Sequence, residues 1–193
     1  KIILAVGSIA IDALETPNGN RKGLLGGSAS YFSIAAGLLA PVKLVGVVGD
    51  DYPEEGWKMF KARGINTDNV HVQPGKTFRW GGKYNNDYSF RDTLFTDLGV
   101  FENFKPQINE DFNQPILYLG NIQPELQFDV IDKIKSPYLI AADSMNLWIN
   151  LFPDKVWELI SRVDLFMLND EEAMQLTNKN NLEEIADDFL NSG

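Results

Sequence analysis

Short apolar runs alternate with longer amphipathic segments along most of the chain. Runs rich in Val, Ile, Leu and Ala occur at Lys1–Gly7, Val42–Gly49, Pro115–Asn121, Pro137–Asp143 and Val163–Asn169. Apolar runs of this length without polar alternation are typical of parallel strands that are buried on both faces. We therefore predict a buried strand at each of these runs.

Segments of helical composition separate or follow these predicted strands. We expect helices at Ser28–Leu39, Tyr52–Ile65, Glu125–Ile134, Asp154–Ser161, Asp170–Leu176 and Leu182–Leu190. Pro41 stops the first of them and Gly64 ends the second. The alternation of strands and helices predicts an α/β fold with a doubly wound, mostly parallel sheet flanked by helices.

Two stretches break this alternation. Ile9–Leu25 carries Pro17 and an Asn18-Gly19 hairpin signal where a helix is expected, and Lys76–Phe101 alternates aromatic and polar residues. Both patterns predict antiparallel ribbons. We expect the two ribbons to form a small, mobile β lid inserted within a single domain that spans residues 1–193. The lid would cover the carboxyl ends of the parallel strands, where open α/β sheets bind ligands.

Composition narrows the chemistry that this chain can perform. The formal net charge of −10 and the absence of a run of Lys and Arg argue against a nucleic-acid surface. No apolar stretch reaches the ~20 residues that span a bilayer, so we expect no membrane partner and a cytoplasmic location. The chain has no Cys, which excludes thiolate catalysis and Cys-ligated zinc, and its single His leaves no His cluster for a transition metal. Any bound metal should therefore be a hard, oxygen-bound ion, and we interpret His71 as an ordinary strand residue.

Polar residues and glycines gather where the predicted strands end. These candidates are Asp12, Gly26, Gly27, Asp50, Asp51, Asn121, Asp143, Asn146, Asn169 and Glu172. Several of them have a structural alternative. The Gly-Gly pair is equally typical of a tight turn with close packing of the helix that follows, and Asp50 or Asp51 is better explained as the N-cap of the next helix. Asn169 has the same alternative as an N-cap. Because each candidate alone has a structural explanation, the argument for a site is that all of them lie at the ends of the predicted strands.

The order of four segments resembles the N-terminal portion of the ribokinase-like, or PfkB-type, carbohydrate kinases. These segments are Gly7–Asp12, Leu25–Tyr31, Val45–Asp51 and Leu168–Thr177. The resemblance runs over the full chain, and its most specific elements are the Gly-Gly pair and the Asn-x-x-Glu of the last segment. It implies ATP- and Mg²⁺-dependent phosphotransfer to a hydroxyl of a sugar, polyol or nucleoside.

The resemblance also implies roles for individual residues. It gives acceptor binding to Asp12 and to the region of Gly26 and Gly27, and we add as further candidates for acceptor binding Ser28, Tyr31, Trp80, Asn121, Asp143 and Asn146. Asn169 and Glu172 would lie near the ATP phosphates, with Glu172 holding magnesium through water. An ionised Asp12 only accepts hydrogen bonds, so it can take two vicinal hydroxyls of the acceptor.

Two departures from the family pattern change these expectations. Tyr31 stands where the family commonly has Asn, and together with Trp80 it suits a flat or larger acceptor such as a nucleoside or an inositol-like ring. An alternative to ligand contact is that the aromatic side chains of Phe78, Trp80 and Tyr84 form the core of the lid itself. No Gly-Ala-Gly-Asp motif occurs. We therefore expect a truncated chain whose catalytic base and most of whose ATP site lie C-terminal to Gly193.

Other functions remain open on the sequence alone. A non-catalytic ligand-binding or regulatory module that retains only the substrate half would carry the same segments. A dinucleotide-binding oxidoreductase is disfavoured, because no G-x-G-x-x-G turn follows Gly7. We further expect a homodimer through the lid, since an exposed sheet edge with apolar side chains invites pairing.

Overall fold

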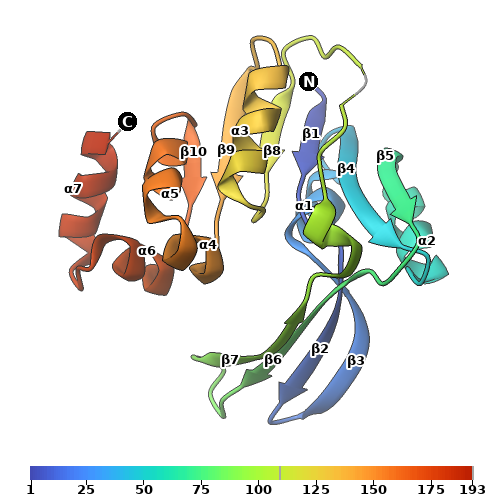
Figure 1. Cartoon of the computed structure of the whole chain (residues 1–193), viewed down its shortest axis with the longest axis horizontal. Helices are drawn as coiled ribbons and strands as arrows, with labels where there is room; N and C mark the ends of the chain where they lie inside the picture. Colours follow the sequence, from blue (N-terminus) through green and yellow to red (C-terminus); the bar gives the residue numbers. More distant parts are fainter. Residues whose placement is uncertain (109, 193) are drawn as a thin grey trace.

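The computed structural model describes residues 1–108 and 110–192. An α/β body carries most of the chain, and a separate four-stranded sheet projects from one end of it (Figure 1). Within the described residues, no helix has the length and apolar character needed to cross a membrane. The two stretches predicted as ribbons form this four-stranded sheet, which we refer to as the lid.

The body contains a six-stranded sheet. Its strands are β1 (Ile3–Val6), β4 (Val42–Gly49), β5 (Asn66–Gln73), β8 (Ile116–Leu119), β9 (Leu139–Asp143) and β10 (Leu165–Met167). They lie in the order β10-β9-β8-β1-β4-β5, and all neighbours pair in parallel. The order reverses between β1 and β8, which confirms the doubly wound prediction and places the switch point of the sheet beside β1. His71 lies in β5, as expected.

Helices cover both faces of this sheet. They are α1 (Ser28–Ala36), α2 (Glu54–Ala62), α3 (Pro124–Lys133), α4 (Asn146–Leu151), α5 (Pro153–Ile160), α6 (Asp170–Thr177) and α7 (Leu182–Ser192), with a 3₁₀ helix η1 (Gly99–Asn103). Leu4 and Val6 pack with α3, α5 and η1, whereas Ile3 and Ala5 pack with α1 and α2 (Figure 1). Successive residues of β1 therefore serve opposite cores, as a strand buried on both faces requires.

The predicted helices are present, with small differences at their ends. Helix α1 ends at Ala36 rather than Leu39, with Gly37 as its C-cap. Gly64 has a φ of 64° just beyond α2 and ends it as expected, because glycine adopts this left-handed conformation without strain. Helix α4 was not predicted, since its six residues are too few for a helical period to be visible.

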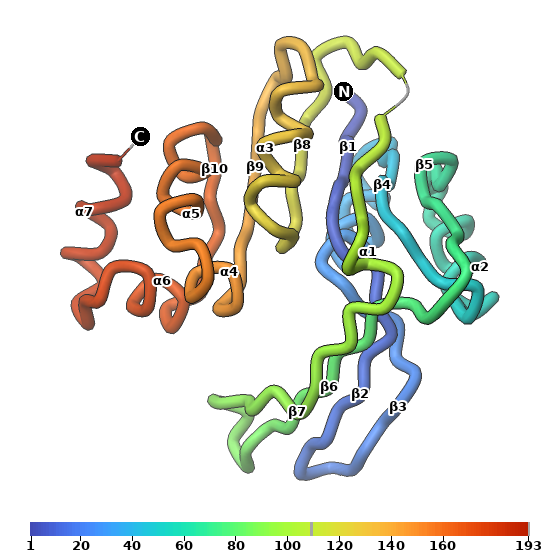
Figure 2. Tube along the Cα trace, viewed as in Figure 1, coloured from blue at the N-terminus to red at the C-terminus, as the bar shows by residue number. Residues whose placement is uncertain are grey.

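The lid is a single mixed β-sheet made from both ribbons. It consists of β2 (Ala10–Thr16), β3 (Gly19–Gly26), β6 (Phe78–Tyr84) and β7 (Arg91–Asp97) in the order β3-β2-β6-β7. Each ribbon is antiparallel, and β2 and β6 join them in parallel. Figure 2 shows both ribbons leaving the body at the carboxyl ends of its strands. Thr16 pairs with Gly19, so the hairpin turns at Pro17 and Asn18 rather than at the predicted Asn18-Gly19.

Asp51 attaches the second ribbon of the lid to the body. Its Oδ1 accepts hydrogen bonds from the N–H and the hydroxyl of Thr77, both at 2.7 Å, and its Oδ2 accepts one from Arg79 Nη2 at 2.6 Å. Burial raises the pKa of Asp51, but the hydrogen bonds from Thr77 and Arg79 outweigh it and hold the pKa at about 2. We call this group of three residues the Asp51 clamp.

The prediction that Asp50 or Asp51 caps the next helix is wrong. The N-cap of α2 is Pro53, and no side chain hydrogen-bonds the first turn. The first turn carries Glu54 and Glu55 instead, whose charges favour a helix N-terminus. Asp51 is thereby available for a partner that is distant in sequence.

Candidate acceptor site

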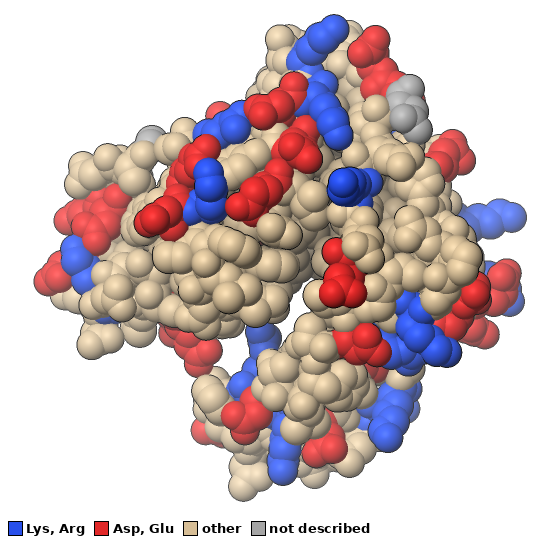
Figure 3. Space-filling model, in the orientation of Figure 1, with Lys and Arg blue, Asp and Glu red and all other residues tan. Residues whose placement is uncertain are grey.

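A cavity of about 430 Å³ lies between the lid and the carboxyl ends of the body strands. In the space-filling view a hollow separates the lid from the body on this face (Figure 3). The predicted site residues that line the cavity are Asp12, Gly27, Ser28, Tyr31, Trp80, Asn121 and Glu172. Its volume lies within the range of about 300–1,000 Å³ that is common for small-molecule sites. The structure thus brings residues from distant parts of the sequence to one cavity.

Asp12 lines this cavity, and Gly26 of β3 lies against its carboxylate. A Cβ atom at position 26 would lie 2.0 Å from Asp12 Oδ2, so only glycine leaves room for the carboxylate. Burial raises the pKa of Asp12 to about 6, and no hydrogen bond offsets this effect among the described residues. The site therefore holds a partly desolvated carboxylate whose acceptor capacity is unused, which suits hydroxyl groups of a ligand.

Gly27 has a different reason to be glycine. Its φ is 96°, and a Cβ there would lie 2.3 Å from the backbone oxygen of Ser8. The close approach allows the Ser28 N–H to donate to Ser8 Oγ at 3.0 Å, and Ser8 Oγ to donate to Asn121 Oδ1 at 3.2 Å. These bonds tie the start of α1 to the loops after β1 and β8. The close-packing interpretation of the Gly-Gly pair is correct for Gly27, which also lines the cavity.

Asn169 and Glu172 form a capping box at the start of α6. The Glu172 N–H donates to Asn169 Oδ1 at 2.8 Å, and the Asn169 N–H donates to Glu172 Oε2 at 3.2 Å. The N-cap interpretation of Asn169 is therefore confirmed. Glu172 also lines the cavity, and burial raises its pKa in spite of these hydrogen bonds. Its second carboxylate oxygen has no role in the capping box.

Several predicted site residues lie outside the cavity lining. These are Gly26, Asp143, Asn146 and Asn169. Asn146 Nδ2 donates to Gln175 Oε1 at 2.8 Å and so links α4 to α6. Asp143 Oδ2 accepts a hydrogen bond from the Tyr118 hydroxyl at 2.7 Å, and burial raises the pKa of Asp143 to about 7. Neither residue lines the cavity.

Sequence analysis missed other residues that line the cavity, among them Ser8, Arg91 and Trp148. The Arg91 guanidinium lies over the ring of Trp80, with 5.4 Å from its central carbon to the ring centroid. Trp148 belongs to α4, which the sequence pattern did not predict. Arg91 was within a predicted ribbon, but the face it occupies depends on a strand register that the pattern alone does not give.

The chain is 26% identical over 190 residues to a cytidine kinase of Thermococcus kodakarensis, and the match covers 95% of this chain and 67% of the relative. No family model matches the chain. A nucleoside kinase of Methanocaldococcus jannaschii, described as an archaeal member of the ribokinase family, superposes with a TM-score of 0.71 at 20% identity. That match covers 99% of this chain and 67% of the other.

Two further solved structures share the architecture. A ribokinase of Cryptococcus neoformans in complex with ADP has a TM-score of 0.76 at 16% identity, covering 100% of this chain and 66% of the other. A nucleoside kinase of Burkholderia thailandensis in complex with inosine has a TM-score of 0.76 at 18% identity, covering 97% and 66%. The chain spans about two thirds of the length of the proteins it matches.

The fold defines the class of protein. The chain has the ribokinase-like α/β fold, with a six-stranded sheet flanked by helices and a lid over the carboxyl ends of its strands. The resemblance to ribokinase-like, or PfkB-type, kinases that the sequence segments predict is confirmed by these neighbours.

Proposed function

We propose that this chain is the acceptor-binding part of an ATP-dependent kinase that phosphorylates a hydroxyl of a small polyhydroxylated molecule. The observation that carries the proposal is the desolvated carboxylate of Asp12, held against Gly26 at the wall of the cavity. A hydroxylated acceptor would satisfy this carboxylate, whereas a molecule without hydroxyls would leave it unpaired. The kinases among the relatives support the same class of reaction.

Among sugars, polyols and nucleosides, the cavity favours a nucleoside. Tyr31, Trp80, Tyr84 and Trp148 place aromatic rings in the lining, on both the lid and the body. Aromatic rings stack on a flat base, while Asp12 is suited to the hydroxyls of the attached sugar. The matched cytidine kinase and the nucleoside kinase in complex with inosine support this choice.

The described residues provide only a few of the contacts that ATP and Mg²⁺ need. The described residues hold no group of three or more His, Cys, Asp or Glu side chains arranged to bind a metal. Glu172, at the cavity and partly occupied by its capping bond, fits contact with Mg²⁺ through water rather than direct ligation. We assign Glu172, which lines the cavity, and Asn169, which caps the same helix, to the nucleotide phosphates, and we assign no catalytic base to the described residues.

The exposed edge of the lid supports a further part of the proposal, a homodimer. Strand β7 is an edge strand whose residues are all exposed, and Leu94 and Phe95 keep 46% and 45% of their surface accessible. An exposed strand with apolar side chains is a surface for pairing with a second copy. Sedimentation should give a dimer for the full-length protein and a monomer for Leu94→Lys; equal masses for both would remove this surface as the interface.

The direct test is a phosphorylation screen of the full-length protein with MgATP. Ribonucleosides, pentoses, hexoses and polyols are offered separately, and the phosphorylated product is identified by mass. We expect phosphorylation of a ribonucleoside in preference to free sugars. An acceptor that binds without being phosphorylated under any condition would contradict the proposal and favour the ligand-binding or regulatory module.

A further inference from the structure

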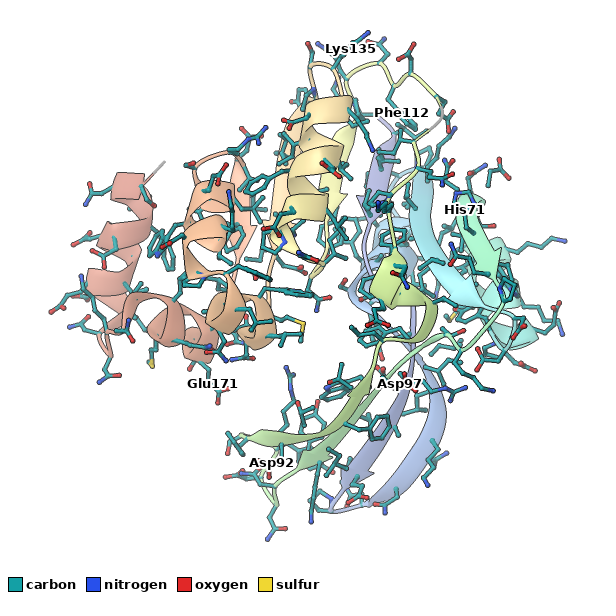
Figure 4. All side chains as sticks on the ribbon, in the orientation of Figure 1. His71, Asp92, Asp97, Phe112, Lys135 and Glu171 are labelled. Atoms are coloured by element: carbon teal, nitrogen blue, oxygen red, sulfur yellow. The ribbon has the colours of Figure 1, made fainter. Side chains whose placement is uncertain are left out.

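Gln127 is a fully buried polar side chain in α3. With 1% of its surface accessible, it is the one polar residue among the largest fully buried side chains of the described chain. Figure 4 shows α3 running away from the lid, with Lys135 labelled beyond its last turn at the far end of the body. Gln127 is the fourth residue of the helix, so it lies toward the lid end of α3.

The side-chain amide of Gln127 bonds to three backbone carbonyl groups. Its Nε2 donates to the carbonyl oxygens of Gly120 and Asp143, both at 3.0 Å, and to that of Leu119 at 3.4 Å. Leu119 is the last residue of β8 and Gly120 the first residue after it, whereas Asp143 is the last residue of β9. One side chain from α3 therefore joins the carboxyl ends of two neighbouring strands.

These hydrogen bonds begin where the pairing of the two strands stops. The ladder between β8 and β9 ends at Leu119 and Ala142, and Asp143 pairs onward with Met167 of β10. Beyond that point the Gln127 amide takes the place of ladder bonds in joining the two strand ends. A buried carbonyl group that loses its hydrogen-bond partner is destabilised, so we expect the strand ends to move when the amide is removed.

The loops that start at these two strand ends both contribute to the cavity. Asn121 of the first loop and Ser144 and Met145 of the second loop line it. A shift of one loop against the other changes the distances between these side chains, and a misplacement of ~1 Å can cost on the order of a hundredfold in rate. Gln127 is outside the cavity lining, so its influence on a ligand passes through the loops.

We propose that Gln127 is a positioning residue that fixes the separation of the loops after β8 and β9, and with it the shape of the acceptor side of the cavity. The inference rests on the proposed function and deepens it. The Gln127 amide bonds to the ends of β8 and β9, whereas Glu172 reaches the cavity from α6. The positioning role therefore concerns the acceptor rather than the nucleotide, and this difference separates it from a general contribution to folding.

The test compares two variants of the full-length protein by steady-state kinetics with the acceptor that the phosphorylation screen identifies. Gln127→Met keeps the length of the side chain but removes its N–H donors. Leu159→Ala is the matched control, because Leu159 of α5 has no exposed surface and lies in the apolar core that α3 packs against. Its truncation lowers stability without removing the hydrogen bonds of Gln127. Circular dichroism and urea unfolding establish the fold and the stability of each variant.

We expect Gln127→Met to raise the KM for the acceptor by about tenfold and to leave the KM for ATP unchanged. A protein that is only less stable has a smaller folded fraction, which lowers the apparent kcat and leaves both KM values as they were. That is the result expected for Leu159→Ala. An acceptor KM that Gln127→Met leaves unchanged, or an equal rise of both KM values, would overturn the inference.

A second measurement uses the wild-type protein and requires no substitution. The NMR signals of the Gln127 side-chain amide are followed as the acceptor is added, with the exposed Gln73 of β5 as the reference. Contact of the acceptor with Asn121 and Ser144 should shift the Gln127 signals, because the carbonyl groups that this amide bonds belong to the same two chain segments. The Gln73 signals should stay in place. Gln127 signals that do not move when the protein is saturated with acceptor would contradict the positioning role.

Hydrogen exchange without ligand separates the inference from the proposed function. Gln127→Met should speed the exchange of residues 120–122 and 144–146 relative to Leu159→Ala, and equal exchange in the two variants would overturn the inference. Faster exchange there, in a protein whose wild type phosphorylates no acceptor, would refute the kinase proposal and leave the positioning role standing. Phosphorylation by wild type, with an acceptor KM that Gln127→Met does not change, would refute the positioning role alone.

Discussion

The body and the lid are both sheets, yet they are stabilised in different ways. Strand β1 of the body is buried along its whole length, whereas β7 of the lid is exposed along its whole length. The central body strands β1, β4 and β8 are enclosed between two apolar cores, while the lid depends on the pairing of β2 with β6 and on the Asp51 clamp. The buried body strands stabilise the fold, whereas the exposed lid strand leaves its surface available for contact with a ligand or a second copy of the chain. The cavity lies at their boundary.

The largest difference should appear when one apolar side chain is truncated in each region. Leu117 of β8 has no exposed surface and Leu94 of β7 keeps 46% exposed. Leu117→Ala should lower the free energy of unfolding by about 3–5 kcal/mol, through lost burial and a residual cavity. Measured on the monomer at low protein concentration, Leu94→Ala should change the free energy of unfolding by less than about 0.5 kcal/mol. Urea unfolding measures both, and equal losses would refute the division between body and lid.

A smaller effect is expected where the first ribbon returns to the body. Gly27→Ala places a Cβ atom 2.3 Å from the Ser8 backbone oxygen at a φ of 96°. We expect a loss of roughly 2–4 kcal/mol from strain and overpacking together. Gly23→Ala is the control, with a φ of 73° and no atom within 4 Å of the new Cβ, and should cost about 1 kcal/mol. If thermal unfolding shows similar losses for the two variants, the close approach at Gly27 is unimportant.

The Asp51 clamp should affect the lid more than the body. Asp51→Asn removes the charge that Arg79 and Thr77 bind, so amides of β6 and β7 should exchange about tenfold faster while those of β1 are unchanged. Asp50→Asn, at the exposed neighbouring position, is the control. Equal acceleration in β1 would mean that Asp51 stabilises the whole fold.

The same clamp predicts a pH dependence. The folded pKa of Asp51, about 2, lies below its unfolded value of about 4. Its contribution is therefore complete above pH ~4 and is lost as the pH falls towards 2. Protection of the β6 and β7 amides should decline in this window in wild type. Asp51→Asn should lack that decline; a decline of the same size in the variant would assign the effect to other carboxylates.

The substitution with the smallest expected effect on stability, Asp12→Asn, should stabilise the protein rather than destabilise it. Asp12 has a folded pKa of about 6, above its unfolded value, so its ionisation lowers stability as the pH rises from about 4 to 6 and remains unfavourable above that. Asp12→Asn should therefore raise stability at pH 7 by about 1 kcal/mol, after allowance for solvent screening. It should also weaken acceptor binding by about tenfold to a hundredfold. A variant that is destabilised and binds normally would show that Asp12 is structural.

The body could be predicted from the sequence because its pattern is local. The run Val42–Gly49 is apolar without interruption, and β4 has these bounds. The capping box is equally local, since three residues separate Asn169 from Glu172. Gly64 ended α2 for the same kind of reason, a backbone conformation that glycine alone adopts easily. Patterns of this kind need no knowledge of the rest of the chain.

The lid and the wall of the cavity could be predicted only in part. The local pattern predicts an N-cap at Asp51, because its true partner Thr77 is 26 residues away, beyond any local rule. The parallel pairing of β2 with β6 joins two ribbons that the sequence separates, and it decides which face Trp80 and Arg91 occupy. Trp148 was missed because α4 has too few residues to show a period. The partner of Asp51 and the faces of the lid strands thus depend on long-range contacts, which a local sequence pattern does not contain.

Hydrogen exchange with and without a bound acceptor tests the central claim most directly. The full-length protein is saturated with the acceptor that the phosphorylation screen identifies, and exchange of residues 77–93 in the lid is compared with that of β1 and β8 in the body. If the lid closes over the acceptor at the cavity, the lid amides become protected while the body amides, already buried, do not change. Exchange of the lid that is identical with and without the acceptor would contradict the account.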